Sequence, residues 1–182
     1  MDAVTLLQER RSVRKFQDKK VSKKDMDEIL NTTRFAPSWS NSQTARFNII
    51  SSDEIIDRIA NEAFGSFEWN SKAVKAAPMV AVVSYELGKS GYGPIGDMAS
   101  EKGDNWGFFD SALATQQFVL AAYEKGVGTV IQGIFDEDKI AEILKLPENE
   151  VVACVIPFGY EIEGKHGKAP KRKPVEEIVR YF

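Results

Sequence analysis

The residues best suited to binding chemistry lie early in the chain, in the stretch Glu9-Arg10-Arg11-Ser12-Val13-Arg14-Lys15-Phe16. Three arginines and a serine fall within five residues, so planar guanidinium groups with several donors stand beside a short hydroxyl. A phosphate monoester offers many acceptor oxygens and favours paired arginine partners. The stretch therefore predicts a phosphate site, although a charged cluster near a chain end is also often only a solvated surface.

A second stretch suited to directed hydrogen bonds is Ser38-Trp39-Ser40-Asn41-Ser42-Gln43. Its hydroxyls and amides can donate and accept, and Pro37 before it favours a loop. The glycine-rich residues 88–107 predict a long loop, which is either a lid over a site or a surface excursion without a role.

The near absence of histidine and cysteine excludes several reaction classes. The chain has one of each, His166 and Cys154, whereas a zinc site needs several such ligands. No Gly-x-Ser-x-Gly turn is present to display a nucleophilic serine. A Cys–His pair stays formally open, but Cys154 sits in an apolar run typical of a strand core. If the protein is an enzyme, its chemistry is expected to come from a bound cofactor.

The composition is that of one ordinary globular domain over residues 1–182, with 43% apolar and 28% charged residues. A net charge of −3 provides no overall positive field for nucleic acid, and the apolar run near residues 80–83 is too short to span a bilayer. The start of the chain lacks a signal-like segment, and a single cysteine forbids an intrachain disulfide. A cytoplasmic protein without nucleic-acid or membrane partners is therefore expected.

The elements that position these side chains are predicted by capping residues and periodicity. Asp2, Ser22 and Ser52 are expected to cap helices, and Ser22 with Asp25 resembles a capping box with the shorter acid. Further helices are expected from Asp136 to about residue 144 and over residues 105–125, the latter stopped by Gly126. The expected strands are residues 46–50, 78–85, 128–133 and 151–158. Helices and strands alternate without a strict βαβ rhythm, which favours an α+β fold.

The helix expected over residues 105–125 is apolar nearly all round, which is typical of a helix buried on nearly all sides. In a domain this small, the pattern favours packing against a second copy of the chain. Burial within one subunit is the alternative.

Taken in this order, the pieces resemble the FMN-dependent nitroreductase family over essentially the whole chain. Arg10-Arg11-Ser12-Val13-Arg14 is similar to the family's Arg-x-Ser-x-Arg opening, and residues 36–43 are similar to its Pro-Ser-x-x-Asn-x-Gln loop. The helix containing Asp110 runs into Gly126-Val127-Gly128-Thr129, and residues 171–179 are similar to the basic pair and Glu-Glu-hydrophobic tail of shorter members.

The resemblance implies an α+β fold with a mixed, mostly antiparallel central sheet flanked by helices. It also implies an intertwined homodimer, with FMN at the subunit interface and a tail over residues 165–182 that embraces the partner. NADH or NADPH would reduce FMN by hydride transfer at N5, and nitroaromatics, quinones or similar flat acceptors would then take the electrons in a ping-pong cycle. No protein side chain is implied as a catalytic acid or base.

The resemblance further implies which residues bind the flavin. The phosphate and lower ribityl chain would contact the cationic stretch, completed from the tail. The flavin's pyrimidine edge, often that of the other subunit, would contact the polar loop. Asn70 would lie near the isoalloxazine, and the backbone of Gln132 and Gly133 would face N5 and O4. The complete expected set is Arg10, Arg11, Ser12, Arg14, Ser38, Asn41, Gln43, Asn70, Gln132, Gly133, Lys171 and Arg172.

One departure from the family pattern is Thr44-Ala45, which stands where Pro-Trp is common. Loss of that pair predicts a less stiff loop and makes a relative's substrate preference unsafe to transfer. Other FMN chemistry on the same fold therefore stays open, namely enone reduction, reductive dehalogenation or flavin fragmentation. A flavin carrier or sensor without turnover is a further alternative. The sequence favours neither NADH nor NADPH.

Overall fold

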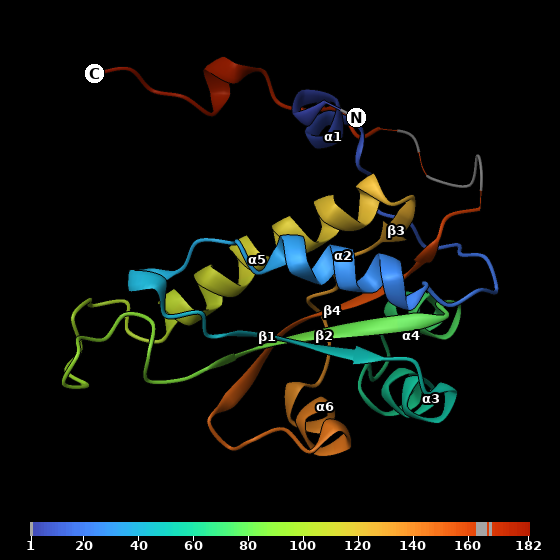
Figure 1. The fold of residues 1–182 in the computed structure, drawn as a ribbon, viewed down its shortest axis with the longest axis horizontal. Coiled ribbons are helices and arrows are strands. Elements are labelled where there is room, and N and C mark those ends of the chain that lie inside the picture. Colours follow the sequence, from blue (N-terminus) through green and yellow to red (C-terminus); the bar gives the residue numbers. More distant parts are fainter. Residues whose placement is uncertain (1, 163–166, 168) are drawn as a thin grey trace.

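The computed structural model describes residues 2–162, 167 and 169–182 and shows a four-stranded sheet between two layers of helices (Figure 1). The helices are α1 (Ala3–Glu9), α2 (Lys23–Thr33), α3 (Asp53–Glu62), α4 (Glu68–Lys75), α5 (Asn105–Glu124) and α6 (Glu137–Leu144), with short 3₁₀ turns η1 (Trp39–Asn41) and η2 (Val175–Glu177). The strands are β1 (Ala45–Ile50), β2 (Met79–Glu86), β3 (Val127–Thr129) and β4 (Glu150–Tyr160). The architecture is the expected α+β fold.

The strand order is β1-β2-β4-β3, and every neighbouring pair of strands is antiparallel. Among the described residues, the one parallel contact is an isolated bridge between Ser12 and Thr129. That bridge places the cationic stretch beside the outer edge of β3. The mostly antiparallel sheet predicted from the resemblance is therefore confirmed.

Two apolar cores lie on opposite faces of the sheet. On one face α2 and α5 pack over Ala81, Val83 and Ile156, with Phe118 of α5 fully buried. On the other face α3, α4 and α6 cover Val80, Val82 and Val155 (Figure 1). Adjacent residues along β2 thus face different cores, as the two-residue period of a strand requires.

The start of α2 is held by Tyr160 of β4. The Ser22 side chain accepts from the backbone N–H of Asp25, as an N-cap should. A reciprocal capping box was expected, but the shorter Asp25 side chain does not reach back to the Ser22 N–H. The Tyr160 hydroxyl fills that gap, since it accepts from the Ser22 N–H at 3.2 Å and donates to Asp25 Oδ2 at 2.5 Å.

Helix α4 was not predicted, because its residues read as a connection containing glycine, tryptophan and asparagine. Its N-cap is Phe67, which provides no side-chain hydrogen bond, so the usual capping signature is missing. Packing supports the helix instead: Ala73 and Val74 are buried, and Ser71 donates to the Ala60 carbonyl of α3.

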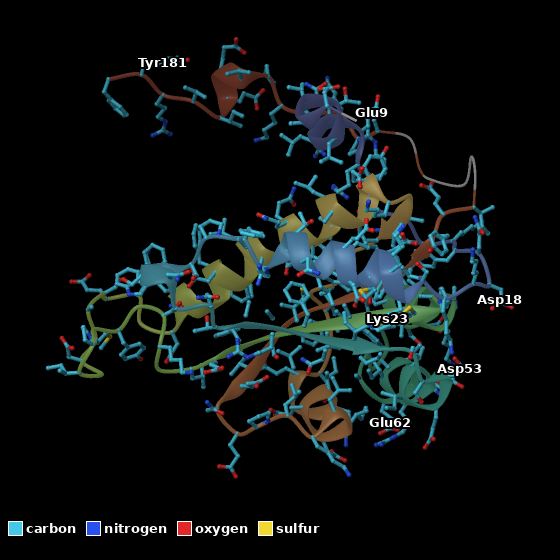
Figure 2. The ribbon with its side chains drawn as sticks, in the orientation of Figure 1. Glu9, Asp18, Lys23, Asp53, Glu62 and Tyr181 are labelled. Atoms are coloured by element: carbon cyan, nitrogen blue, oxygen red, sulfur yellow. The ribbon has the colours of Figure 1, made fainter. Side chains whose placement is uncertain are left out.

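The C-terminal segment extends past α1 and away from the sheet (Figure 1). It is amphipathic in sequence but forms only the turn η2. Val175, Ile178 and Phe182 are exposed, and Tyr181 projects into open space (Figure 2). His166 and part of the tail predicted over residues 165–182 lie outside the described residues. No helix within the described ranges is long and apolar enough to cross a membrane.

Candidate functional site

The cationic stretch lines an open groove of about 410 Å³ at the end of α1. Its walls bring together Arg10, Arg11, Ser12 and Arg14 with Arg172 of the tail, so residues far apart in sequence meet here. Lys171 is exposed and does not line the groove. The expected pairing of the first stretch with Arg172 therefore appears within one chain.

The groove has an excess of positive charge. Burial, followed by the charges of Arg11 and Arg172, lowers the pKa of Arg10 below its ordinary value. Within the described part of the chain, neither Arg10, Arg14 nor Arg172 pairs with a carboxylate. Like charges gathered without a carboxylate partner among the described residues favour an anion, and the donor set suits a phosphate.

The neighbouring arginines differ in their local bonds. The Arg11 guanidinium donates to the carbonyls of Gln8 at 2.5 Å and Arg10 at 3.0 Å, which closes the end of α1. The Arg10 side chain has no such backbone bond among the described contacts. Arg10 is therefore available to a ligand, whereas Arg11 serves the helix end.

The strand that holds the stretch also leads to the second part of the site. Val13 donates its backbone N–H to the Thr129 carbonyl at 2.9 Å. Gln132 follows three residues later, or about 10 Å along an extended chain. Its backbone exchanges hydrogen bonds with Val155 of β4, which fixes the turn after β3.

Three predicted residues, Asn70, Gln132 and Gly133, meet at this turn. The Gln132 side-chain amide donates to the Asn70 carbonyl at 3.2 Å, and the Asn70 amide donates to the Ile134 carbonyl at 3.1 Å. Gln132 Oε1 is buried without a hydrogen-bond partner among the described residues. A β-carbon added at Gly133 would meet nothing within 4 Å, so open space adjoins this backbone. The turn therefore carries a buried acceptor without a partner among the described residues and, at Gly133, a stretch of backbone next to open space.

The polar loop lies at the other end of the molecule's long helix. The Trp39 backbone N–H donates to Asp110 near the start of α5, whereas β3 with the bridged Ser12 follows its end. Asp110 lies 14 residues before Glu124, the last residue of α5, which corresponds to about 21 Å along the helix. Ser38, Asn41 and Gln43 are therefore not brought to the groove of their own chain. Ser38 and Gln43 instead line a separate cavity of about 310 Å³, to which Asn41 does not contribute.

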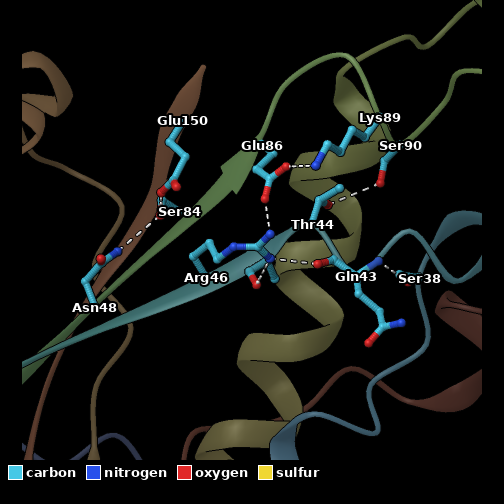
Figure 3. A network of polar contacts seen from close by, with 11 residues as sticks. Ser38, Gln43, Thr44, Arg46, Asn48, Ser84, Glu86, Lys89, Ser90 and Glu150 are labelled. Carbon is cyan, nitrogen blue, oxygen red and sulfur yellow. Dashed lines mark hydrogen bonds and ion pairs between the residues drawn. The ribbon is translucent and has the colours of Figure 1, made fainter. Parts of the chain in front are cut away.

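Arg46, the second residue of β1, holds this loop in place (Figure 3). Its guanidinium donates to the Gln43 carbonyl at 2.8 Å and pairs with Glu86 of β2, which also pairs with Lys89. Thr44 is fully buried and its hydroxyl meets Ser90 (Figure 3). Residues in the unusual Thr44-Ala45 segment thus tie the loop to the sheet with polar contacts, which the sequence alone did not predict.

The Cys154 thiol is not suited to be the nucleophile of a catalytic Cys–His pair. Cys154 is buried in β4, and burial raises the pKa of its thiol to about 11. A thiol of that kind is inert at neutral pH. Among the described residues, no cluster of His, Cys, Asp or Glu is arranged to hold a metal ion.

The donor set and the open turn together fit FMN. Guanidinium groups in the groove suit its phosphate, and the partnerless Gln132 acceptor and open space at Gly133 suit a flat ring with a polar edge. The fit concerns these residues of one chain, while the polar loop would have to come from elsewhere.

Comparison with known proteins agrees with this geometry. A model of the nitroreductase family matches residues 7–160. A protein of Methanothermobacter thermautotrophicus, provisionally named an NADH dehydrogenase/NAD(P)H nitroreductase, is 29% identical over 90% of this chain and 79% of its own length. The iodotyrosine deiodinase of Thermotoga neapolitana is 25% identical over 97% of this chain and 95% of its own.

A solved structure of an FMN-dependent nitroreductase from Clostridium difficile shares the fold. Its TM-score is 0.73 and its identity 26%, with 91% of each chain covered. The family match spans the cationic stretch, the polar loop and the turn after β3, so it covers both parts of the site. The chain therefore belongs to the nitroreductase family.

Proposed function

We propose that the protein is an NAD(P)H-dependent FMN oxidoreductase that reduces nitroaromatics, quinones or similar flat, electron-poor acceptors. The observation that carries the proposal is the groove at Arg10, Ser12, Arg14 and Arg172, whose positive charge has no carboxylate partner among the described residues. The groove is joined through β3 to the open turn at Gly133.

The groove would bind the FMN phosphate. Guanidiniums facing a dianion can each contribute about 1.5–3 kcal/mol to binding through charge-assisted hydrogen bonds. Arg10 and Arg172 would neutralise most of the charge, and the Ser12 hydroxyl would add a donor for a phosphate or ribityl oxygen. Lys171 would add only longer-range attraction, because it does not line the groove.

The turn after β3 would position the reactive ring. A backbone N–H at Gly133 can approach N5 closely because no β-carbon intervenes. Gln132 Oε1 would accept from a ring or ribityl donor, and Asn70 would hold the Gln132 side chain in place. The chemistry that FMN supplies when bound is acceptance of a hydride from NADH or NADPH and return of the electrons to a second substrate.

A homodimer follows from the same proposal. Ser38, Asn41 and Gln43 lie most of the length of α5 away from the groove of their own chain, so they would serve the flavin of a second copy. The outward face of α5, with Phe108 and Phe109 about half exposed, would provide part of the interface. The exposed apolar tail would lie on the partner. A cytoplasmic location stays a prediction.

Reductive dehalogenation is the second candidate, favoured by the Thermotoga deiodinase relative, which covers nearly the whole chain. The same flavin site would serve it, with a halogenated aromatic as acceptor. Enone reduction and a carrier role have no such relative in their favour among those described above.

The first test is the absorption spectrum of the freshly purified protein, followed by extraction and identification of any chromophore. FMN near one per chain, bleached at about 450 nm by NADH or NADPH without oxygen, would support the proposal. Turnover with a quinone, a nitroaromatic and an iodophenol would then separate the two candidates. Flavin that binds but is not reduced would identify a carrier, and a protein that cannot bind added FMN would refute the proposal.

A further inference from the structure

We propose that Asp110 is a positioning residue, which fixes the backbone of the Ser38–Gln43 loop so that its polar side chains can meet the flavin. The link to flavin rests on the proposed function. The claim that Asp110 fixes the loop backbone rests on contacts within the chain. The two claims are tested by different measurements.

The loop needs an external support because its backbone is unfavourable. Ser40, Asn41 and Gln43 have φ values of 43°, 56° and 50°, in the left-handed region that residues with a β-carbon rarely adopt. Asn tolerates this region, but Ser and Gln gain no such allowance. Three such residues within four positions persist only if their surroundings hold them there.

One carboxylate oxygen of Asp110 supplies that support. Oδ2 accepts from the Trp39 backbone N–H at 3.0 Å and from the Ser90 hydroxyl at 2.6 Å, with the Ser42 hydroxyl at 3.4 Å. Asp110 is 3% exposed, although it stands on a helix of mostly apolar residues. A buried carboxylate costs free energy of folding unless its oxygens accept hydrogen bonds. The Asp110 carboxylate therefore needs the donors of the loop, and the loop needs the carboxylate.

Ser90 extends the support to the far end of the loop. Its hydroxyl lies 2.7 Å from that of Ser42 and 3.2 Å from that of Thr44. With its own proton given to Asp110, the Ser90 oxygen can accept from both neighbours, which satisfies all three hydroxyls. Ser90 and Thr44 are 1% and 0% exposed, so water does not compete for these bonds.

The arrangement joins three parts of the chain at one carboxylate: the polar loop, the segment after β2 and α5. The Trp39 indole N–H also donates to the Tyr92 carbonyl, and its ring packs on Trp106 with centroids 4.9 Å apart. The start of the 88–107 segment is thereby held beside the loop. A buried polar network that only stabilised the fold would not need to select this unfavourable backbone.

The test compares Ser90→Ala with Ser111→Ala in the full-length protein. Both serines are 1% exposed, but among the described residues the Ser111 hydroxyl bonds only to the Phe108 carbonyl of its own helix. Amide hydrogen exchange of residues 39–44 is measured first, without flavin. We expect about tenfold faster exchange in Ser90→Ala, the factor for loss of one hydrogen bond to a charged group, and no change in Ser111→Ala.

The second measurement is FMN affinity by fluorescence titration of the same proteins, with KM and kcat for a quinone. FMN binding about tenfold weaker in Ser90→Ala alone, with both variants fully folded at the temperature of the titration, would support the positioning role. Faster exchange without any change in FMN affinity, KM or kcat would overturn the link to the site. Exchange equal to that of the wild type would overturn the part of the support that passes through Ser90.

Two failures of the experiment can be distinguished from failure of the proposal: a Ser90→Ala protein that does not fold and a wild-type protein that does not bind FMN. If Ser90→Ala does not fold, Thr44→Val removes the neighbouring hydroxyl at nearly constant volume and takes its place. If the wild-type protein does not bind FMN, the proposed function fails on that measurement alone. The exchange rates of residues 39–44 then still decide whether Asp110 and Ser90 hold the loop.

Discussion

Single residues of the same type have different roles in this site. Arg10 and Arg11 are adjacent and equally charged, yet only Arg11 is bonded to backbone carbonyls at the end of α1. Arg10 faces Arg11 and Arg172 in a groove that lowers its pKa. Removing either guanidinium should therefore affect different properties.

Arg10→Ala is expected to weaken FMN binding more than Arg11→Ala. Loss of one charge-assisted contact to phosphate corresponds to about 1.5–3 kcal/mol, or roughly 10- to 150-fold in affinity. Arg11→Ala should mainly fray α1. The flavin-to-protein ratio and the dissociation constant of each variant check this, and equal losses in the two variants would contradict it.

Gly133→Ala is expected to change FMN affinity without changing the stability of the fold. The added β-carbon meets no protein atom within 4 Å, so the melting temperature should stay that of the wild type. If the ring lies against this backbone, FMN affinity should fall about tenfold or more because the methyl group keeps it away from the N–H. Titration with FMN and a thermal melt of the apo-protein give the two values. Unchanged affinity would place the ring elsewhere.

Among the elements, α2 shows how the start of a helix can depend on a distant strand. Hydrogen bonds from Tyr160, and then from Ser22, lower the pKa of Asp25 below its ordinary value of 3.8. A carboxyl whose pKa is lowered by folding stabilises the fold above the pKa of the unfolded chain. This stability is lost as the pH falls through the lower folded value.

Tyr160→Phe is therefore expected to lower the melting temperature most above about pH 4, with the difference from the wild type narrowing below that pH. The Phe ring keeps the contact of Lys19 with the aromatic face, so the change is confined to the hydroxyl. Tyr85→Phe is the control, since the Tyr85 hydroxyl makes no hydrogen bond among the described contacts. A pH-independent difference would contradict the role given to Asp25.

Local patterns predicted those elements whose capping residue and buried face are both explicit in the sequence. Ser52 with Ile56 and Ile59 gave α3, and the apolar run of β2 gave the central strand. Helix α4 was not predicted because the side chain of Phe67, its N-cap residue, makes no capping hydrogen bond. In the candidate site, the support at Asp110 joins residues up to 71 positions apart, which no local pattern reveals. A carboxylate within the apolar stretch of a helix was its one visible sign.

At the scale of the whole molecule, the cationic groove and the polar loop, which are both predicted to contact flavin, lie near opposite ends of α5. The groove lies where the end of α5 leads into β3, and the polar loop contacts Asp110 near the start of α5, while the turn at Gln132 pairs with Val155 in the middle of β4. This separation predicts that each flavin takes residues from two chains. The resemblance implied a shared site, while the distance within one chain supplies a structural reason for it.

A heterodimer of an Arg10→Ala chain and an Asn41→Ala chain tests the shared site. With contacts from both chains, one site of this dimer is intact and the other carries both changes. About half of the wild-type flavin should then remain, held with wild-type affinity. Differently tagged chains purified through both tags allow the measurement, and the two homodimeric variants are the controls. Two sites that are both weakened, each to the extent seen in the matching homodimeric variant, would show that the residues act within one chain.

The C-terminal segment has a consequence for how the protein is maintained in a cell. In an isolated protomer, Val175, Ile178, Tyr181 and Phe182 stand exposed on a segment with little regular structure. Apolar side chains on an exposed terminus are what chaperones and proteases select. A chain that has found its partner would bury them. If the proposed homodimer forms, we expect the abundance of the protein to depend on its rate of assembly as well as on its synthesis, because unassembled chains would be removed first.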